Sequence, residues 1–103
     1  MVIYNVTAQM EPPIATKWLE WMKEIHLPEV FRCGAFEAIN ILKIHSDTLD
    51  NISYAVQYVA ASNAILQNYL NQWANKHEAA ENKAFGQKVL RFQTRLEIIH
   101  SVT

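Results

Sequence analysis

The sequence predicts a single α+β domain over residues 1–103 with the element order βαββαβ. Segments in which apolar and polar residues alternate predict strands, and segments with apolar residues three and four apart predict helices. Prolines and glycines lie near several of the expected junctions between these segments. Half of the 103 residues are hydrophobic, with only two glycines and three prolines, so the chain is expected to fold around a core of its own.

The first strand is expected at residues 2–10, where Tyr4 and Val6 share one face and Asn5 and Thr7 the other. A helix follows Pro12-Pro13, because proline at a helix start loses no hydrogen bond. Its apolar stripe consists of Ile14, Trp18, Trp21, Met22 and Ile25. Pro28 is expected to end it, since proline disfavours helical geometry in the preceding residue.

The rest of the chain is expected to contain three more strands and one more helix. Strands are expected at residues 35–45 and 52–60, joined by a polar turn at 46–51, and a last strand is expected at 89–100. A long helix should run from an N-cap at Ser62 to a C-cap at Gly86, with an interruption near residues 75–76. Its inner stripe is expected to comprise Leu66, Tyr69, Trp73, His77, Ala80 and Ala84.

Right-handed crossovers then give a four-stranded antiparallel sheet of order 4-1-3-2 with two helices on one face, the ferredoxin-like arrangement. The residues expected beneath the helices are Tyr4, Val6, Tyr54, Val56, Phe92 and Leu96. The open face should carry Asn5, Thr7, Gln9, Ser53, Gln57, Arg91, Gln93, Arg95 and Glu97. Such a face meets either water or another subunit. A polar pocket on it, where Arg91 or Arg95 pairs with an anion, is the alternative.

The whole chain resembles a family of small bacterial proteins known only as a domain of unknown function. The resemblance lies in the opening Ile3-Tyr4-Asn5-Val6-Thr7, the block around Trp18, Trp21 and His26-Leu27-Pro28, the strand at 54–58 and the close at 92–96. It implies the dimeric α/β-barrel version of the ferredoxin-like fold, in which two open sheet faces pack together, and it implies no activity.

Other dimeric α/β-barrel proteins, which include small monooxygenases and haem-degrading enzymes, are similar in having a helix that ends in a His-x-Pro-like sequence. The haem-degrading members use an asparagine, a tryptophan and a histidine, residue types that Asn5, Trp73 and His77 supply here. Asn5 is expected on the open face and the other two beneath the helices, which argues against one shared site.

Several classes of function are disfavoured by composition and spacing. The formal net charge is −1 with no basic cluster, so we expect no nucleic-acid partner, and the RNA-recognition fold, with its base-stacking strands, lacks its basic signature here. The histidine spacings predict no metal site, and we expect no cofactor. No apolar run is long enough to cross a bilayer, so no membrane association is expected. The single Cys33 fits a reducing compartment, and we expect a cytoplasmic protein.

We therefore expect a homodimer, formed through the open sheet face, that acts as a non-catalytic small-ligand-binding or protein-interaction module. The alternative is a cofactor-independent enzyme of the monooxygenase or isomerase type, with its pocket near His26 between helices and sheet. No catalytic residue is assigned. The candidate ligand-binding residues are His26, Trp18, Trp21, Asn5, Gln57, Arg91 and Arg95.

Overall fold

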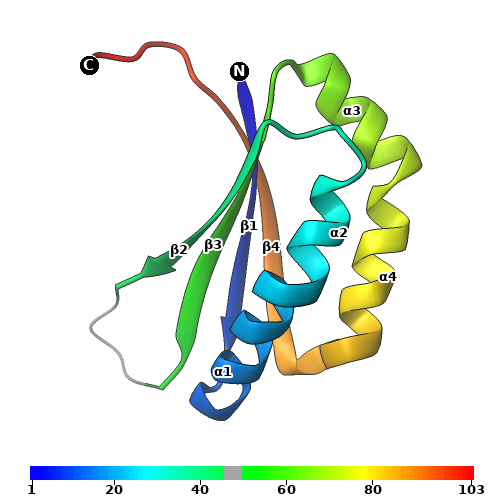
Figure 1. Ribbon diagram of the computed structural model, residues 1–103. Coiled ribbons are helices and arrows are strands. Elements are labelled where there is room, and N and C mark those ends of the chain that lie inside the picture. Colours follow the sequence, from blue (N-terminus) through cyan, green and yellow to red (C-terminus); the bar gives the residue numbers. More distant parts are fainter. Residues whose placement is uncertain (46–49) are drawn as a thin grey trace.

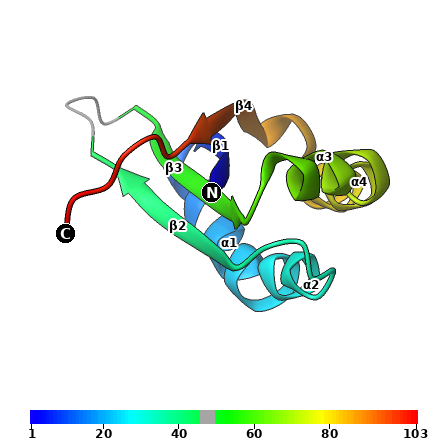
Figure 2. The ribbon, with the colours of Figure 1, turned by 90° about the horizontal axis from the view of Figure 1, so that it is seen from above.

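The computed structural model describes residues 1–45 and 50–103 and has two layers, a sheet and a set of helices that covers one of its faces (Figures 1 and 2). The expected polar turn at 46–51 falls largely outside the described residues. The sheet is antiparallel, in the order β2-β3-β1-β4, which read from β4 is the 4-1-3-2 order expected from the sequence. The strands are β1 (Val2–Met10), β2 (Ala38–Ile44), β3 (Ile52–Ala60) and β4 (Val89–Glu97).

The first helical segment continues through Pro28, where the sequence predicted an end. It consists of α1 (Pro12–Trp21), a π-helical turn η1 (Met22–His26) and α2 (Leu27–Phe31). Proline has no N–H and its ring crowds the carbonyl four residues earlier, so an unbroken α-helix cannot pass this point. The chain widens into a π-turn instead, in which the Leu27 amide donates to the Met22 carbonyl.

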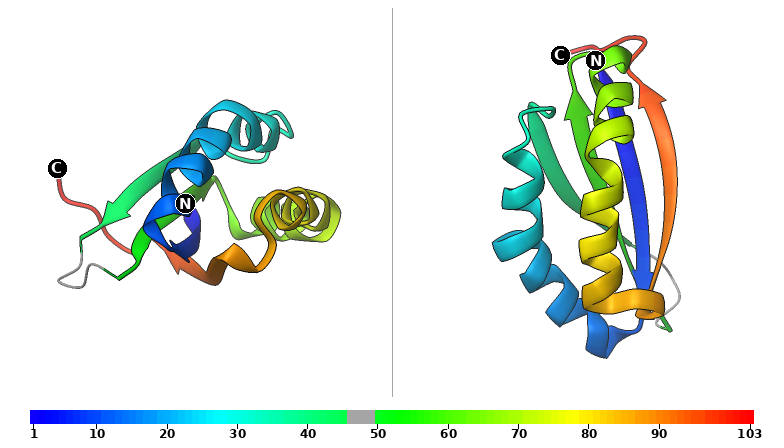
Figure 3. Two further views of the ribbon diagram at one scale, coloured as in Figure 1. Left: turned by 90° about the horizontal axis from the view of Figure 1, so that it is seen from below. Right: turned by 90° about the vertical axis from the view of Figure 1, so that its right-hand side faces the viewer.

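The second helical segment is divided at Trp73 into α3 (Asn63–Gln72) and α4 (Ala74–Phe85), slightly before the interruption expected near 75–76. Ser62 caps α3 as expected, because its hydroxyl accepts a hydrogen bond of 3.2 Å from the Ile65 amide. Gly86 ends α4 with a positive φ of 56°, a region that favours glycine, and opens the 3₁₀ turn η2 (Gly86–Lys88). The two helical segments lie side by side across the sheet (Figure 3).

The core lies between the helices and the inner sheet face. Trp18 is fully buried and stacks on Tyr54, with ring centroids 5.3 Å apart. The most deeply buried large side chains are Trp18, Met22, Val30, Val56 and Leu66. The expected core role of Trp18 is therefore confirmed.

The expected faces of β4 are wrong. Arg91, Gln93 and Arg95 pair with Ala8, Val6 and Tyr4 of β1, and therefore lie on the helix side of the sheet. Phe92 and Leu96 lie on the open face, 59% and 42% exposed. Alternation along an edge strand gives two faces but does not say which face is buried, and here the polar face meets polar groups of α4.

The open face is consequently less polar than predicted. It presents Ile3, Asn5, Thr7, Gln9, Ala38, Asn40, Leu42, Ile44, Ser53, Ala55, Gln57, Val59, Leu90, Phe92, Thr94 and Leu96. Among these described strand residues none is charged. The C-terminal segment leaves β4 on the side away from the helices, where Ile99 and Val102 are largely exposed (Figure 2).

Candidate functional site

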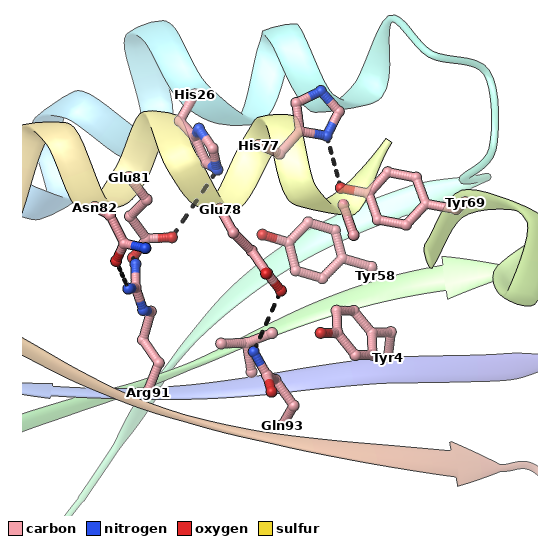
Figure 4. A pocket seen from close by; sticks show the side chains of 12 residues that line it. Tyr4, His26, Tyr58, Tyr69, His77, Glu78, Glu81, Asn82, Arg91 and Gln93 are labelled. Carbon is pink, nitrogen blue, oxygen red and sulfur yellow. Dashed lines mark hydrogen bonds and ion pairs between the residues drawn. The ribbon is translucent and has the colours of Figure 1, made fainter. Parts of the chain in front are cut away.

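A cavity of about 110 Å³ lies between the sheet and the helices, under α4 and beside β4. Polar side chains dominate its wall, although it occupies a position where the core would otherwise continue (Figure 4). The lining residues are Tyr4, Val6, His26, Tyr58, Tyr69, Ala74, His77, Glu78, Glu81, Asn82, Arg91 and Gln93. Six different elements thus contribute to one site.

Glu81 organises one end of the cavity. Its carboxylate accepts a hydrogen bond of 3.3 Å from the Trp18 indole and pairs with Arg91 Nη1 at 3.1 Å. Arg91 also donates to Asn82, so its guanidinium is held by two partners on α4. Only 9% of the Glu81 side chain and 18% of the Arg91 side chain are exposed. This buried pair joins α1, α4 and β4, and a pair with such partners is costly to break.

His26 enters the cavity from the π-turn η1. Its ring stacks on Trp21 with centroids 4.6 Å apart, and its Nε2 lies 4.0 Å from Glu81 Oε1. That distance is too long for a direct hydrogen bond, so a water molecule or a ligand group could lie between them. Burial lowers the pKa of His26, although the charge of Glu81 partly opposes this, and the imidazole is therefore neutral at pH 7.

A second pair occupies the opposite end of the cavity. The hydroxyl of Tyr69 and Nδ1 of His77 are joined by a hydrogen bond of 2.7 Å (Figure 4). Burial raises the pKa of the Tyr69 hydroxyl and lowers the pKa of His77, so both groups are uncharged at neutral pH. This end offers neutral donors and acceptors.

Tyr4 and Tyr58 form the floor of the cavity. They are direct partners on β1 and β3, and their ring centroids lie 5.9 Å apart. Tyr58 is only 7% exposed and lines the cavity, and its hydroxyl makes no hydrogen bond to another described side chain. Burial holds the pKa of Tyr58 well above its usual range, so the hydroxyl keeps its proton. A hydroxyl that lines a cavity without a protein partner is a natural contact for a ligand.

The mouth of the cavity lies along the seam between α4 and β4. Gln93 donates to Glu78 across this seam at 3.4 Å, and Arg95 donates to Gln67 of α3 at 3.0 Å. Glu78 and Gln93 are solvent-exposed, in contrast to Glu81 deeper inside. The entrance is therefore closed only by weak polar contacts.

The predicted site residues separate into three groups. His26 and Arg91 line the cavity, and Trp18 and Trp21 lie directly behind its wall as the partners of Glu81 and His26. Arg95 lies near the mouth without lining the cavity. Asn5 and Gln57 pair with each other on the open face, on the opposite side of the sheet.

Sequence reasoning missed the tyrosines of the cavity and Glu81. Strand alternation placed Tyr4 and Tyr58 on the inner face and the helix stripe placed Tyr69 there, and a buried tyrosine has the same pattern whether its hydroxyl meets a cavity or a packed side chain. The four-residue spacing of His77 and Glu81 on α4 was the available signal, because residues at i and i+4 share a helix face. Among the described residues, no group of three histidine, cysteine, aspartate or glutamate side chains could hold a metal ion.

Comparison with known proteins assigns the chain to a family. The model of a family described as "Domain of unknown function (DUF4286)" matches residues 1–99, almost the whole chain. The chain belongs to this family. The resemblance drawn from the tryptophan block and the strand sequences is thereby confirmed. No curated protein matches the sequence, and no helix among the described residues is long and apolar enough to cross a membrane.

Proposed function

We propose that this member of the DUF4286 family is a homodimeric protein that binds a small polar molecule in the cavity beneath α4. The observation that carries the proposal is Tyr58, a buried residue that lines the cavity with a protonated hydroxyl for which no hydrogen bond is made among the described residues. Small-molecule sites typically combine an enclosed volume with a few convergent polar groups. Around Tyr58 these groups are His26, Tyr4 and the Tyr69–His77 pair.

The size of the cavity limits the size of the ligand. An apolar cavity of roughly 150 Å³ takes up benzene, and this cavity measures about 110 Å³. The part of the ligand that enters is therefore no larger than a small ring or a short chain. The Glu81–Arg91 pair and the stacked Trp21 hold the wall in place before binding, which reduces the entropy cost of ordering the site.

Exchange of Tyr58 for phenylalanine tests the binding site. Tyr58→Phe keeps the ring and removes the hydroxyl, so we expect the affinity for a ligand to fall about two- to tenfold, the worth of one hydrogen bond. Tyr54→Phe is the matched control, because Tyr54 is also buried on β3 but lies outside the cavity. Ligands are found by screening compounds of fewer than about ten non-hydrogen atoms by amide NMR. Equal affinities of the two variants, or hits that cluster elsewhere, would contradict the proposed site.

The dimer is supported by the composition of the open face. That face bears no charged strand residue among those described, and it exposes Leu42, Leu90 and Phe92. Exposed apolar patches of this kind mark interaction surfaces, and an uncharged face can meet an identical copy without repulsion. Two ferredoxin-like subunits packed through this face would form the dimeric α/β barrel. A cytoplasmic location also belongs to this proposal and rests on the single Cys33.

A catalytic function is the second candidate, and the His26–Glu81 contact favours it. A neutral imidazole that faces a carboxylate across 4.0 Å can accept a proton once a ligand draws the two groups together. The reaction would be of the isomerase or monooxygenase type and would need no cofactor. Solvent deuterium uptake into a bound compound, present in the wild type and absent in His26→Gln, would favour the enzyme. Binding without any uptake would favour the binding protein.

A further inference from the structure

The two carboxylates of the cavity differ in their partners. Glu81 is matched by Arg91 at 3.1 Å, whereas Glu78 at the mouth has no cation within ion-pair distance among the described residues. The only partner of the Glu78 carboxylate there is the Gln93 amide at 3.4 Å. Arg95, the cross-strand partner of Tyr4, lies near the mouth but donates to Gln67, so Glu78 is left without a direct ion pair.

The Glu78 carboxylate acts on the cavity floor. Burial is the main reason why the pKa of Tyr4 is raised; the charge of Glu78 raises it further, and the charge of Arg95 opposes this. Burial is also the main reason why the pKa of Tyr58 is raised, where Glu81 raises it further and Arg91 opposes it. The faces of both rings are electron-rich.

Aromatic faces together with a carboxylate form a recurring arrangement for holding ammonium groups. We propose, on the basis of the binding function proposed above, that the ligand is a small organic cation with a primary ammonium group. The ammonium group lies at the mouth, between the Glu78 carboxylate and the ring and hydroxyl of Tyr4. The uncharged remainder extends inward past Tyr58 toward His26.

An anion fits the same site poorly. The guanidinium of Arg91 already serves Glu81 and Asn82, so an incoming carboxylate or phosphate would have to displace a buried partner. It would also have to pass Glu78, which repels negative charge at the entrance. The pairing of Arg91 with an anion, one alternative raised by the sequence, is therefore disfavoured by the geometry.

Three probes of matched size separate the ligand classes: n-butylamine, 1-butanol and butyrate, each titrated into the full chain at pH 7 and followed by amide NMR. We expect n-butylamine to shift the amides around Tyr4, Tyr58 and Glu78, and to bind more tightly than the other two. Glu78→Gln should weaken the amine about fivefold, as expected for one partly exposed ion pair. Glu20→Gln, which removes an exposed carboxylate from α1, should leave its affinity unchanged.

The outcomes distinguish this inference from the function on which it rests. If 1-butanol bound as tightly as the amine and Glu78→Gln had no effect, the ligand would not be a cation, but the cavity would still be a binding site. Preferential binding of butyrate would lead to the same conclusion. Failure of all three probes to shift any cavity amide would overturn the binding function and the inference together.

Discussion

His26 is a buried imidazole that the protein keeps neutral at physiological pH. It is surrounded by the ring of Trp21, the carboxylate of Glu81, His77 of α4 and the guanidinium of Arg91. Burial lowers its pKa more than Glu81 raises it, while His77 and Arg91 lower it further. Protonation of His26 therefore disfavours the folded state. A histidine whose pKa is lower in the folded than in the unfolded chain makes the free energy of unfolding depend on pH.

The direction of this dependence follows from the lowered pKa. The unfolded chain binds the proton near pH 6.5, whereas folded His26 binds it only at lower pH, so stability is complete above about 6.5 and falls as the pH drops. We expect the free energy of unfolding, measured in urea between pH 7 and 5.5, to fall by up to about 1.4 kcal/mol per pH unit for each such histidine. His26→Gln should reduce this slope.

His45→Gln is the matched control, because His45 is exposed at the end of β2. It should leave the slope as it is in the wild type. If both variants kept the wild-type slope, His26 would not be the buried neutral group described above.

At the scale of the elements, two departures from regular helix place the residues of the site. The π-turn η1 shifts the phase of the first helical segment, so that Ile25 is 60% exposed and His26 is buried. The break at Trp73, where φ is −118°, shifts the phase of α4, so that Glu81 is buried and Ala80 is exposed. Both changes turn a polar side chain into the cavity.

These shifts explain what the sequence could and could not predict. Regular α-helical periodicity placed Trp18 and Tyr69 correctly, because they precede the irregular turns. Within η1 and beyond Trp73 the same periodicity predicted Ile25 and Ala80 inside, which is wrong, whereas His77 is buried as predicted. Pro28 indicated that the helix must change there, but proline alone does not distinguish an end from a π-turn.

Glu81 connects three elements and should be the most sensitive position of the site for stability. Glu81→Ala would leave Arg91 and the Trp18 indole without their partner, so we expect a loss of about 3 kcal/mol in the free energy of unfolding. Glu78→Ala, on the same helix but exposed, should change it by less than about 0.5 kcal/mol. Chemical denaturation of both variants measures the difference. A loss below about 1 kcal/mol for Glu81→Ala would show that the three elements are held together by other contacts.

At the scale of the whole molecule, the sheet separates two surfaces with different chemistry. The helix side encloses the polar cavity, and the open side is partly apolar and carries no charge among the described strand residues. The strand positions and their spatial order could be predicted from alternation and crossover handedness. Which face of β4 lies toward the helices could not be predicted, because an edge strand with apolar residues on one face and polar residues on the other fits either orientation.

The open face provides the test of the proposed dimer. Thr7→Asp places a charge at the middle of this face, next to Phe92, where it would be buried between two subunits without a partner. We expect the dimer dissociation constant to rise by at least a hundredfold, about 3 kcal/mol. Asn68→Asp adds the same charge to an exposed position of α3 and should have no effect. Light scattering at low micromolar concentration distinguishes these results, and an unchanged dimer mass for Thr7→Asp would contradict this interface.

The most direct test of the proposed dimer and the proposed binding function together is native mass spectrometry of the protein purified under mild conditions, with nothing added. We expect a species of twice the chain mass that carries a small additional mass on each chain. A species of single chain mass with nothing bound would contradict both the dimer and the occupied cavity.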